Sequence, residues 1–134
     1  MKVLLILLVL IPLKTQVISS KPVKKDIIVT ATCYNATVEQ CDSDPSTTAF
    51  GYKVNMKYPL SQRYIAISRD LEEYFKAGDT VIVEGTFVYD GYWIVADRMN
   101  KRWEKKIDFL VKKNDFMDRF DNVTIIHKDE RRNS

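Results

Sequence analysis

The sequence predicts a mainly β protein, folded as a closed or nearly closed barrel. Short apolar runs rich in β-branched and aromatic residues, about six or seven of them, alternate with turn-forming residues. The two segments with helical character span only one or two turns, so no helix could cover an open parallel sheet. Closing the sheet removes exposed strand edges, and 134 residues suit one such domain.

The first half of the chain contains two of the expected strands. The segment 26–34 is β-branched and partly alternating, which is typical of a strand, and the segment 35–46 is rich in turn residues. A second strand is expected at 64–68. It is followed by one or two helical turns at 70–77, where Asp70 is a suitable N-terminal cap.

The second half contains the remaining strands. The pair Asp90-Gly91 between apolar runs is a strong hairpin signal and predicts a tight turn there. The remaining elements are expected as strands at 80–84, 86–89, 92–96, 107–111 and 123–127, and a short helix at 113–120.

The first 20 residues are typical of a secretory signal peptide. A positive Lys2 precedes the apolar stretch Val3 to Leu13, and small residues follow at 17–20. That stretch is shorter than the roughly 20 residues that span a bilayer, so no membrane span is expected after cleavage. The chain therefore divides into a signal peptide at 1–20, a linker at 21–26, the barrel domain at 27–128 and a disordered tail at 129–134. It is expected to be secreted or periplasmic.

Charge and composition exclude several classes of partner. The net charge is +3, and two of the basic residues, Lys2 and Lys14, lie in the signal segment, so the remainder is nearly neutral. Nucleic-acid binding driven by net charge is therefore not expected. The single histidine, His127, has no Cys/His cluster near it in the sequence, so neither a metal site nor another cofactor is expected.

The two cysteines, Cys33 and Cys41, are the only ones in the chain. An even number of cysteines in an exported protein favours a disulfide between them. Two reduced thiols are the alternative.

Two aspartates are placed unusually within apolar runs. Asp97 follows Ile-Val-Ala, and Asp108 lies eleven positions later inside Ile-Asp-Phe-Leu-Val. A carboxylate in a buried strand loses hydration at a cost, so such residues are candidates for acid–base chemistry. The alternative is a structural role, either as a turn cap or in an ion pair with a basic residue nearby: Arg98, Lys105 or Lys106.

Several segments together resemble the 3D domain family, which is named for three aspartates. They are IAISRDL at 65–71, GDTVIVEG at 78–85, YDGYWIVADRMN at 89–100 and KKIDFLV at 105–111. The resemblance covers about residues 28–127, and the spacing of Asp97 and Asp108 matches the family pattern. This chain has Ser68 at the position of the first family aspartate, and Asp97-Arg98-Met99-Asn100 where the family has Asp-Thr-Gly-Gly.

The resemblance implies a six-stranded double-psi β-barrel like that of lytic transglycosylase A and the stationary-phase muralytic proteins. It implies cleavage of the MurNAc–GlcNAc bond of peptidoglycan without a cofactor, with Asp108 as the catalytic acid/base and Asp97 as its neighbour. One carboxyl group would serve as acid and then as base. We therefore expect burial and the charge of Asp97 to raise the pKa of Asp108, and the two groups to titrate as a coupled pair.

The alternative function is a non-catalytic glycan-binding barrel of the RlpA and expansin kind. The loss of the first aspartate at Ser68 favours this alternative, and the retained pair of aspartates favours the enzyme. In either case the expected partner is peptidoglycan glycan strands, bound by a monomer.

The expected substrate-binding residues surround the two aspartates. Trp103 lies in a polar loop and is expected either to stack on a sugar ring or to anchor that loop against the barrel. Arg102, with Lys101, is suited to carboxylates of the stem peptide. Thr48 and Tyr52 are expected to line the cleft, and Ser68 and Thr48 to bind substrate.

Overall fold

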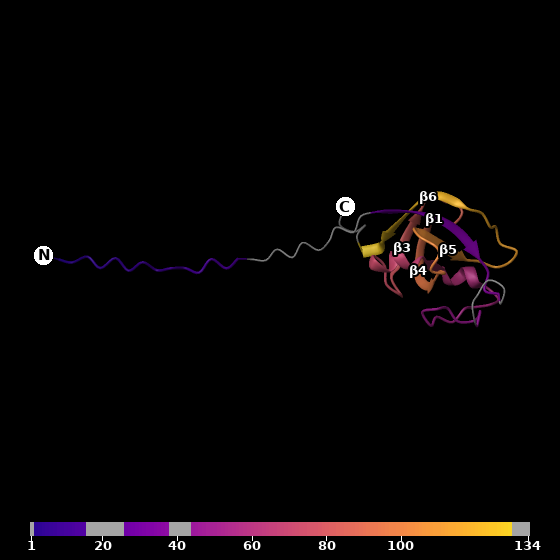
Figure 1. Ribbon diagram of the computed structural model, residues 1–134, viewed down its shortest axis with the longest axis horizontal. Helices are drawn as coiled ribbons and strands as arrows, with labels where there is room; N and C mark the ends of the chain where they lie inside the picture. The colour runs from indigo at the N-terminus through magenta and orange to yellow at the C-terminus, as the bar shows by residue number, and fades with distance from the viewer. Residues whose placement is uncertain (1, 16–25, 38–43, 130–134) are drawn as a thin grey trace.

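The computed structural model describes residues 2–15, 26–37 and 44–129 (Figure 1). Its folded part consists of six strands and two short 3-10 helices. The strands are β1 (Ile27–Tyr34), β2 (Tyr64–Ile67), β3 (Thr80–Glu84), β4 (Gly91–Arg98), β5 (Lys106–Leu110) and β6 (Phe120–His127), and the 3-10 helices are η1 (Pro59–Gln62) and η2 (Arg69–Glu73).

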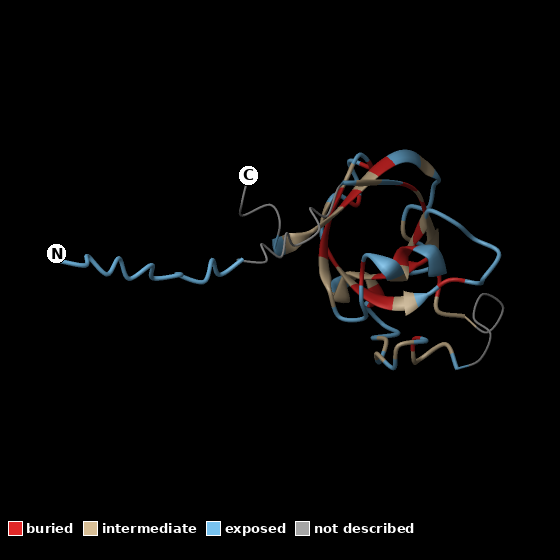
Figure 2. Ribbon diagram, turned by 60° about the vertical axis from the view of Figure 1, so that its left-hand side comes forward, coloured by how far each residue is buried: buried red, intermediate tan, exposed pale blue. Residues whose placement is uncertain are grey.

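The six strands form a closed barrel in the order β1-β5-β2-β4-β3-β6, with β6 returning to β1 (Figure 2). The pairs β1/β5 and β2/β4 are parallel, and the other neighbouring pairs are antiparallel. The predicted fold class, a mainly β six-stranded barrel with one or two short helices, is confirmed. Closure pairs both edges of every strand, as expected for strands this short.

The inside of the barrel is filled by the apolar residues of alternating strand positions. Trp93 is fully buried at its centre, with its ring centroid 4.6 Å from that of Phe109, and Tyr89 packs on both rings. The indole N–H of Trp93 donates to the carbonyl oxygen of Tyr89 at 2.7 Å, so the one polar atom of this side chain is satisfied. The core therefore lies inside the barrel, and a ligand must bind on its outside.

The predicted strand 86–89 and the two-residue turn at Asp90-Gly91 are wrong. A loop, 85–90, joins β3 to β4, and the Asp90 carboxylate closes it by accepting the backbone N–H and the hydroxyl of Thr86 at 2.7 and 2.8 Å. Phe87 has φ 63°, in the left-handed region, unlike the extended backbone of a regular strand. The hairpin between β3 and β4 therefore has a longer connection than the Asp-Gly pair suggested.

The predicted helix at 113–120 is also wrong. A turn is present instead, in which the backbone N–H of Asp115 donates to the carbonyl of Lys112 at 2.9 Å. The carboxylate of Asp115 accepts the N–H of Lys112 in return, at 2.7 Å. These hydrogen bonds close a single turn, and Phe120 already begins β6. The predicted helical turns at 70–77 are present as the shorter 3-10 helix η2, whose N-cap is Ser68 rather than the expected Asp70.

The N-terminal apolar stretch is exposed and forms neither helix nor strand over residues 2–15. Within the described ranges, no helix is long and apolar enough to cross a membrane. The expected cleavage region, 17–20, lies outside the described residues.

Candidate active site

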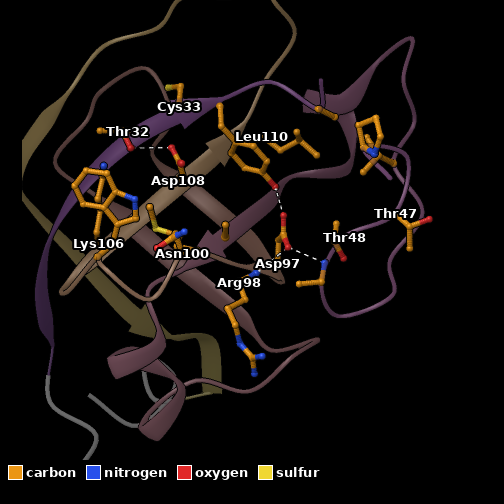
Figure 3. A pocket seen from close by; sticks show the side chains of 18 of the residues that line it. Thr32, Cys33, Thr47, Thr48, Asp97, Arg98, Asn100, Lys106, Asp108 and Leu110 are labelled. Carbon is orange, nitrogen blue, oxygen red and sulfur yellow. Dashed lines mark hydrogen bonds between the residues drawn. The ribbon is translucent and has the colours of Figure 1, made fainter. Parts of the chain in front are cut away.

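A cavity of about 760 Å³ lies on the outer face of the barrel, over strands β1, β5, β2 and β4 (Figure 3). The loop 44–54 forms one wall, and the loop between β4 and β5, with Asn100 and Trp103, forms another. Both Asp97 and Asp108 line it. The two aspartates that the sequence singled out therefore share one cleft.

The floor of the cavity is a row of four residues in register across four neighbouring strands. Thr32 is opposite Asp108, Asp108 is opposite Ala66, and Ala66 is opposite Asp97. Residues directly opposite in a sheet project from the same face. Asp97 and Asp108 are therefore two strand spacings apart, about 10 Å between Cα atoms. The small side chain of Ala66 between them leaves that space open.

A β-bulge in β4 points Asp97 at the cavity. Val95 is opposite Ile65, but Asp97 rather than Ala96 is opposite Ala66, so Ala96 is the extra residue. Trp93 and Val95 are fully buried in the core, and regular alternation would place Asp97 there too. The extra residue reverses the alternation, as bulges next to active sites commonly do.

Asp108 is the perturbed acid of the cavity. Burial raises the pKa of its carboxyl group to about 6, partly opposed by a hydrogen bond from Thr32 and by the charge of Lys106, with a smaller upward contribution from Asp97. The Thr32 hydroxyl donates to Oδ1 of Asp108 at 2.7 Å. Both expected causes of a raised pKa, burial and the neighbouring carboxylate, are therefore confirmed in direction.

Asp108 has no ion-pair partner within the described ranges. Of the three basic residues considered for that role, Arg98 is engaged elsewhere: its guanidinium binds Glu72, with Nη2 at 2.6 Å from Oε1. Lys105 is exposed and forms no ion pair with Asp108. The third, Lys106, acts on Asp108 only through its charge. The ion-pair alternative for Asp108 is therefore not found among the described residues.

The Asp97 carboxylate is held by three donors. Oδ2 accepts the hydroxyl of Tyr34 at 2.9 Å, and Oδ1 accepts the backbone N–H groups of Ala49 and Arg98, each at 2.8 Å. These bonds join β1, β4 and the loop 44–54 (Figure 3). Asp97 therefore fixes the wall of the cavity and places an oriented negative charge beside Asp108.

Trp103 lines the cavity and is 37% exposed. The Lys106 ammonium lies 3.7 Å from its ring centroid, and the Arg102 guanidinium carbon lies 4.7 Å away. Such contacts between cations and an indole ring are stabilising. Trp103 and Arg102 both lie at the cavity as predicted, whereas Lys101 is exposed and is not among the lining residues.

Thr48 lines the cavity as predicted, and its hydroxyl oxygen accepts the backbone N–H of Tyr52 at 3.0 Å. Ser68 does not line it, which corrects the prediction that it binds substrate. Its side chain is fully buried, and Oγ accepts the backbone N–H of Lys106 at 3.0 Å. Ser68 therefore positions the start of β5 rather than a ligand. Asp70, two residues further on, accepts the backbone N–H of Lys105 and also lies outside the cavity lining.

Of the two cysteines of the predicted disulfide, only Cys33 lies among the described residues. Cys33 is half-buried at the edge of the cavity, with Sγ 4.0 Å from the carbonyl oxygen of Asp118, and has no disulfide partner among the described residues. Cys41 lies outside the described residues, so this pairing stays a prediction. Within the described part of the chain, no three His, Cys, Asp or Glu side chains gather closely enough to hold a metal ion.

Sequence reasoning missed three residues of the site: Thr32, Tyr34 and Ala66. Alternation along β1 does place Thr32 and Tyr34 on the face opposite the buried Ala31, so one signal was available. Their contacts with Asp108 and Asp97 depend on strand register, which local sequence does not contain. The chain matches no model of a known protein family, no curated protein and no solved structure.

Proposed function

We propose that this chain is an exported lytic transglycosylase that cleaves the MurNAc–GlcNAc bond of peptidoglycan, with Asp108 as its single acid/base. The observation that carries the proposal is the state of Asp108. Its carboxyl group is buried on the floor of an open cavity, lacks an ion-pair partner in the described part of the chain, and has a pKa raised to about 6. A general acid works best when its pKa is close to the working pH. The sequence resemblance supplies the reaction and the substrate.

The reaction needs only one proton carrier. Protonated Asp108 gives its proton to the glycosidic oxygen as the bond from that oxygen to the anomeric carbon of MurNAc breaks. The resulting carboxylate then takes the proton of the 6-hydroxyl of the same sugar, whose oxygen bonds to the anomeric carbon. A 1,6-anhydro end forms, and Asp108 is protonated again for the next cycle. Asp97, held by its three donors, favours the protonated form of Asp108 at the start of the cycle.

Digestion of purified sacculi tests the proposal. The wild-type protein is expected to release fragments with 1,6-anhydro ends, identified by mass spectrometry as lacking one water relative to hydrolysis products. Asp108→Asn is expected to lose at least about 100-fold of this activity, because an amide cannot donate the proton. Asp121→Asn is the matched control, since Asp121 is exposed on β6 and its partners in the described part of the chain are Arg119 and Thr30. No release by the wild type, or equal release by Asp108→Asn, would contradict the enzyme.

A non-catalytic glycan-binding barrel is the second candidate. The observation in its favour is Ser68, which replaces the first family aspartate and is buried against the backbone. Sedimentation with sacculi separates the two functions. A binding module sediments with sacculi and releases nothing, whereas the enzyme releases fragments and its Asp108→Asn variant still sediments.

A further inference from the structure

Two cations of the cavity lack carboxylate partners among the described residues. Lys106 and Arg102 lie against the ring of Trp103, at 3.7 and 4.7 Å from its centroid, and neither forms an ion pair there. Arg98 lines the same cavity, but its charge is already paired with Glu72. The positive charge that remains available to a ligand is thus concentrated at one place, beside Trp103.

Lys106 is also placed to act on Asp108. The two residues are separated by one position on β5, so both project from the outer face of that strand. The fully buried Ile107 between them points into the core. Figure 3 shows Lys106 on the side of the cavity where Thr32 and Asp108 meet, and its ammonium lies over the Trp103 ring.

The other titratable groups that line the cavity either form hydrogen bonds or ion pairs elsewhere, or act less strongly on Asp108 than Lys106 does. They are Cys33 and Tyr34 on β1, Asp97 and Arg98 on β4, Arg102 in the loop after β4, and Asp44 in the loop 44–54. Asp44 is bound to Ser46, and Asp97 to its three donors. Lys106 and Asp97 are the two charges that act on Asp108, in opposite directions.

We infer that Lys106 and Arg102 bind a carboxylate carried by the glycan, and that binding it makes Asp108 take up a proton. This inference rests on the proposed function. The free Lys106 ammonium favours the ionised form of Asp108. A bound carboxylate cancels that charge and adds a negative one near Asp108, and both changes favour the protonated form. Asp108 thus becomes protonated when an anionic substrate occupies the site.

The chemistry of the glycan identifies the carboxylate. MurNAc carries a lactyl group on its 3-oxygen, next to the glycosidic bond. Its carboxyl group is a free carboxylate on strands from which the stem peptide has been removed, and GlcNAc carries no such group. A sugar ring on Trp103 would place such a group near the two cations, where charge-assisted hydrogen bonds form. The inferred specificity is therefore for muramyl strands with a free lactyl carboxylate, from which the stem peptide has been removed, over neutral chitin-like strands.

A matched pair of ligands tests the inference: the disaccharide GlcNAc–MurNAc and its methyl ester, which lacks the charge. Neither contains the bond that the proposed enzyme cleaves. Protein labelled with ¹³C at the aspartate carboxyl carbons is titrated with acid and base, alone and with each ligand, and the Asp108 signal is assigned by its absence in Asp108→Asn. The acid is expected to bind at least 10-fold more tightly than the ester. It should also raise the titration midpoint of Asp108 by about one pH unit, the lower end of the effect of a neighbouring charge.

Two variants separate the roles of the cations. In Lys106→Met the midpoint should already be raised without ligand, and the acid should bind more weakly and move it less than in the wild type. In Arg102→Gln, an exposed position that does not influence Asp108 in the free protein, the acid should bind more weakly while the free midpoint stays that of the wild type. The second variant keeps the test valid if Lys106→Met fails to fold.

The outcomes that would overturn the inference differ from those that would overturn the proposed function. If the acid and the ester bind equally well, the cavity can still be a glycan site, but the carboxylate subsite is ruled out. If the acid binds more tightly than the ester but the titration midpoint of Asp108 does not change, the coupling between carboxylate binding and protonation of Asp108 is ruled out. If neither ligand binds and sacculi remain intact, the proposed function fails together with the inference.

Discussion

At the scale of single residues, Asp108 is the feature that needs an explanation. Its carboxyl group is buried, accepts one side-chain hydrogen bond, from Thr32, and has its pKa raised to about 6. The folded protein thus binds this proton more tightly than the unfolded chain, in which the pKa is close to 3.8. Such a group makes the folded state less stable as the pH rises from about 4 to about 6, and the loss is complete above that range.

Asp108→Asn is therefore expected to stabilise the protein at neutral pH. The neutral amide keeps the shape of the side chain and an acceptor for Thr32 but has no charge to desolvate. Relative to the wild type, its free energy of unfolding should be higher by up to about 3 kcal/mol at pH 7.5, and this advantage should shrink towards pH 4. Urea unfolding at both pH values measures it. A difference that does not change with pH would show that Asp108 is not perturbed.

Thr32→Val is expected to raise the pKa of Asp108 above 6. The substitution keeps the volume but removes the hydroxyl that donates to the ionised carboxylate at 2.7 Å. With a pKa of about 6, roughly a tenth of the wild-type acid is protonated at pH 7. The variant should therefore keep more of its maximal sacculus-digesting rate at pH 7 to 8. The pH–rate profile measures this shift.

Thr30→Val is the matched control for this shift. Thr30 projects from the same face of β1, but its hydroxyl contacts Asp121, at 3.3 Å. Its pH–rate profile should match that of the wild type. An equal shift in both variants would mean that the hydroxyl of Thr32 has no specific effect on Asp108.

At the scale of elements, the bulge in β4 and the small residue in β2 create the site. The bulge at Ala96 turns Asp97 out of the core, and Ala66 separates the two carboxylates by one strand. Ala66 and Ala31 are both buried alanines in barrel strands, but Ala66 lines the cavity and Ala31 lies in the core. The same substitution at these two positions should therefore have opposite consequences.

Ala66→Val is expected to reduce glycan cleavage at least about 10-fold while changing stability by less than about 1 kcal/mol. The added methyl groups would fill the space between Asp97 and Asp108, and a β-branched residue suits a strand. Ala31→Val should instead destabilise the protein by about 1–3 kcal/mol through overpacking of the core. Sacculus digestion and urea unfolding of both variants test this contrast. A large loss of stability in Ala66→Val would contradict the assignment of open space there.

At the scale of the whole molecule, the barrel is built without the N-terminal stretch. Residues 2–15 are exposed, and the core is formed by residues of the six strands together with Leu71, Phe75, Tyr89 and Val111. A protein that begins at Lys21 is therefore expected to unfold at the same urea concentration as the full chain, within about 0.5 kcal/mol. A clearly lower stability would assign residues 1–20 to the folded domain. If the segment is a signal peptide, N-terminal sequencing of the exported protein should begin at Ser20 or Lys21.

The amino-acid sequence by itself determined the fold class and the candidate acids. Apolar runs too short for helices, separated by turn residues, require paired strands, and closure is the way to pair all their edges. Asp97 and Asp108 stood out because charges within apolar runs are costly. Local signals failed where side chains compete with them: Asp90 and Thr86 build a longer loop than the Asp-Gly pair suggested, and Asp115 closes a turn in place of a helix.

Only the tertiary structure decided which residues share the site. The register of β1, β5, β2 and β4 brings Thr32, Asp108, Ala66 and Asp97 into one row, although they come from distant parts of the chain. The same register buries Ser68 under Lys106 instead of exposing it to a ligand. The direction of Asp97 depends on one extra residue in β4, because a shift of one position moves a side chain to the opposite face of a sheet. Such choices depend on the pairing of whole strands, and no local pattern contains them.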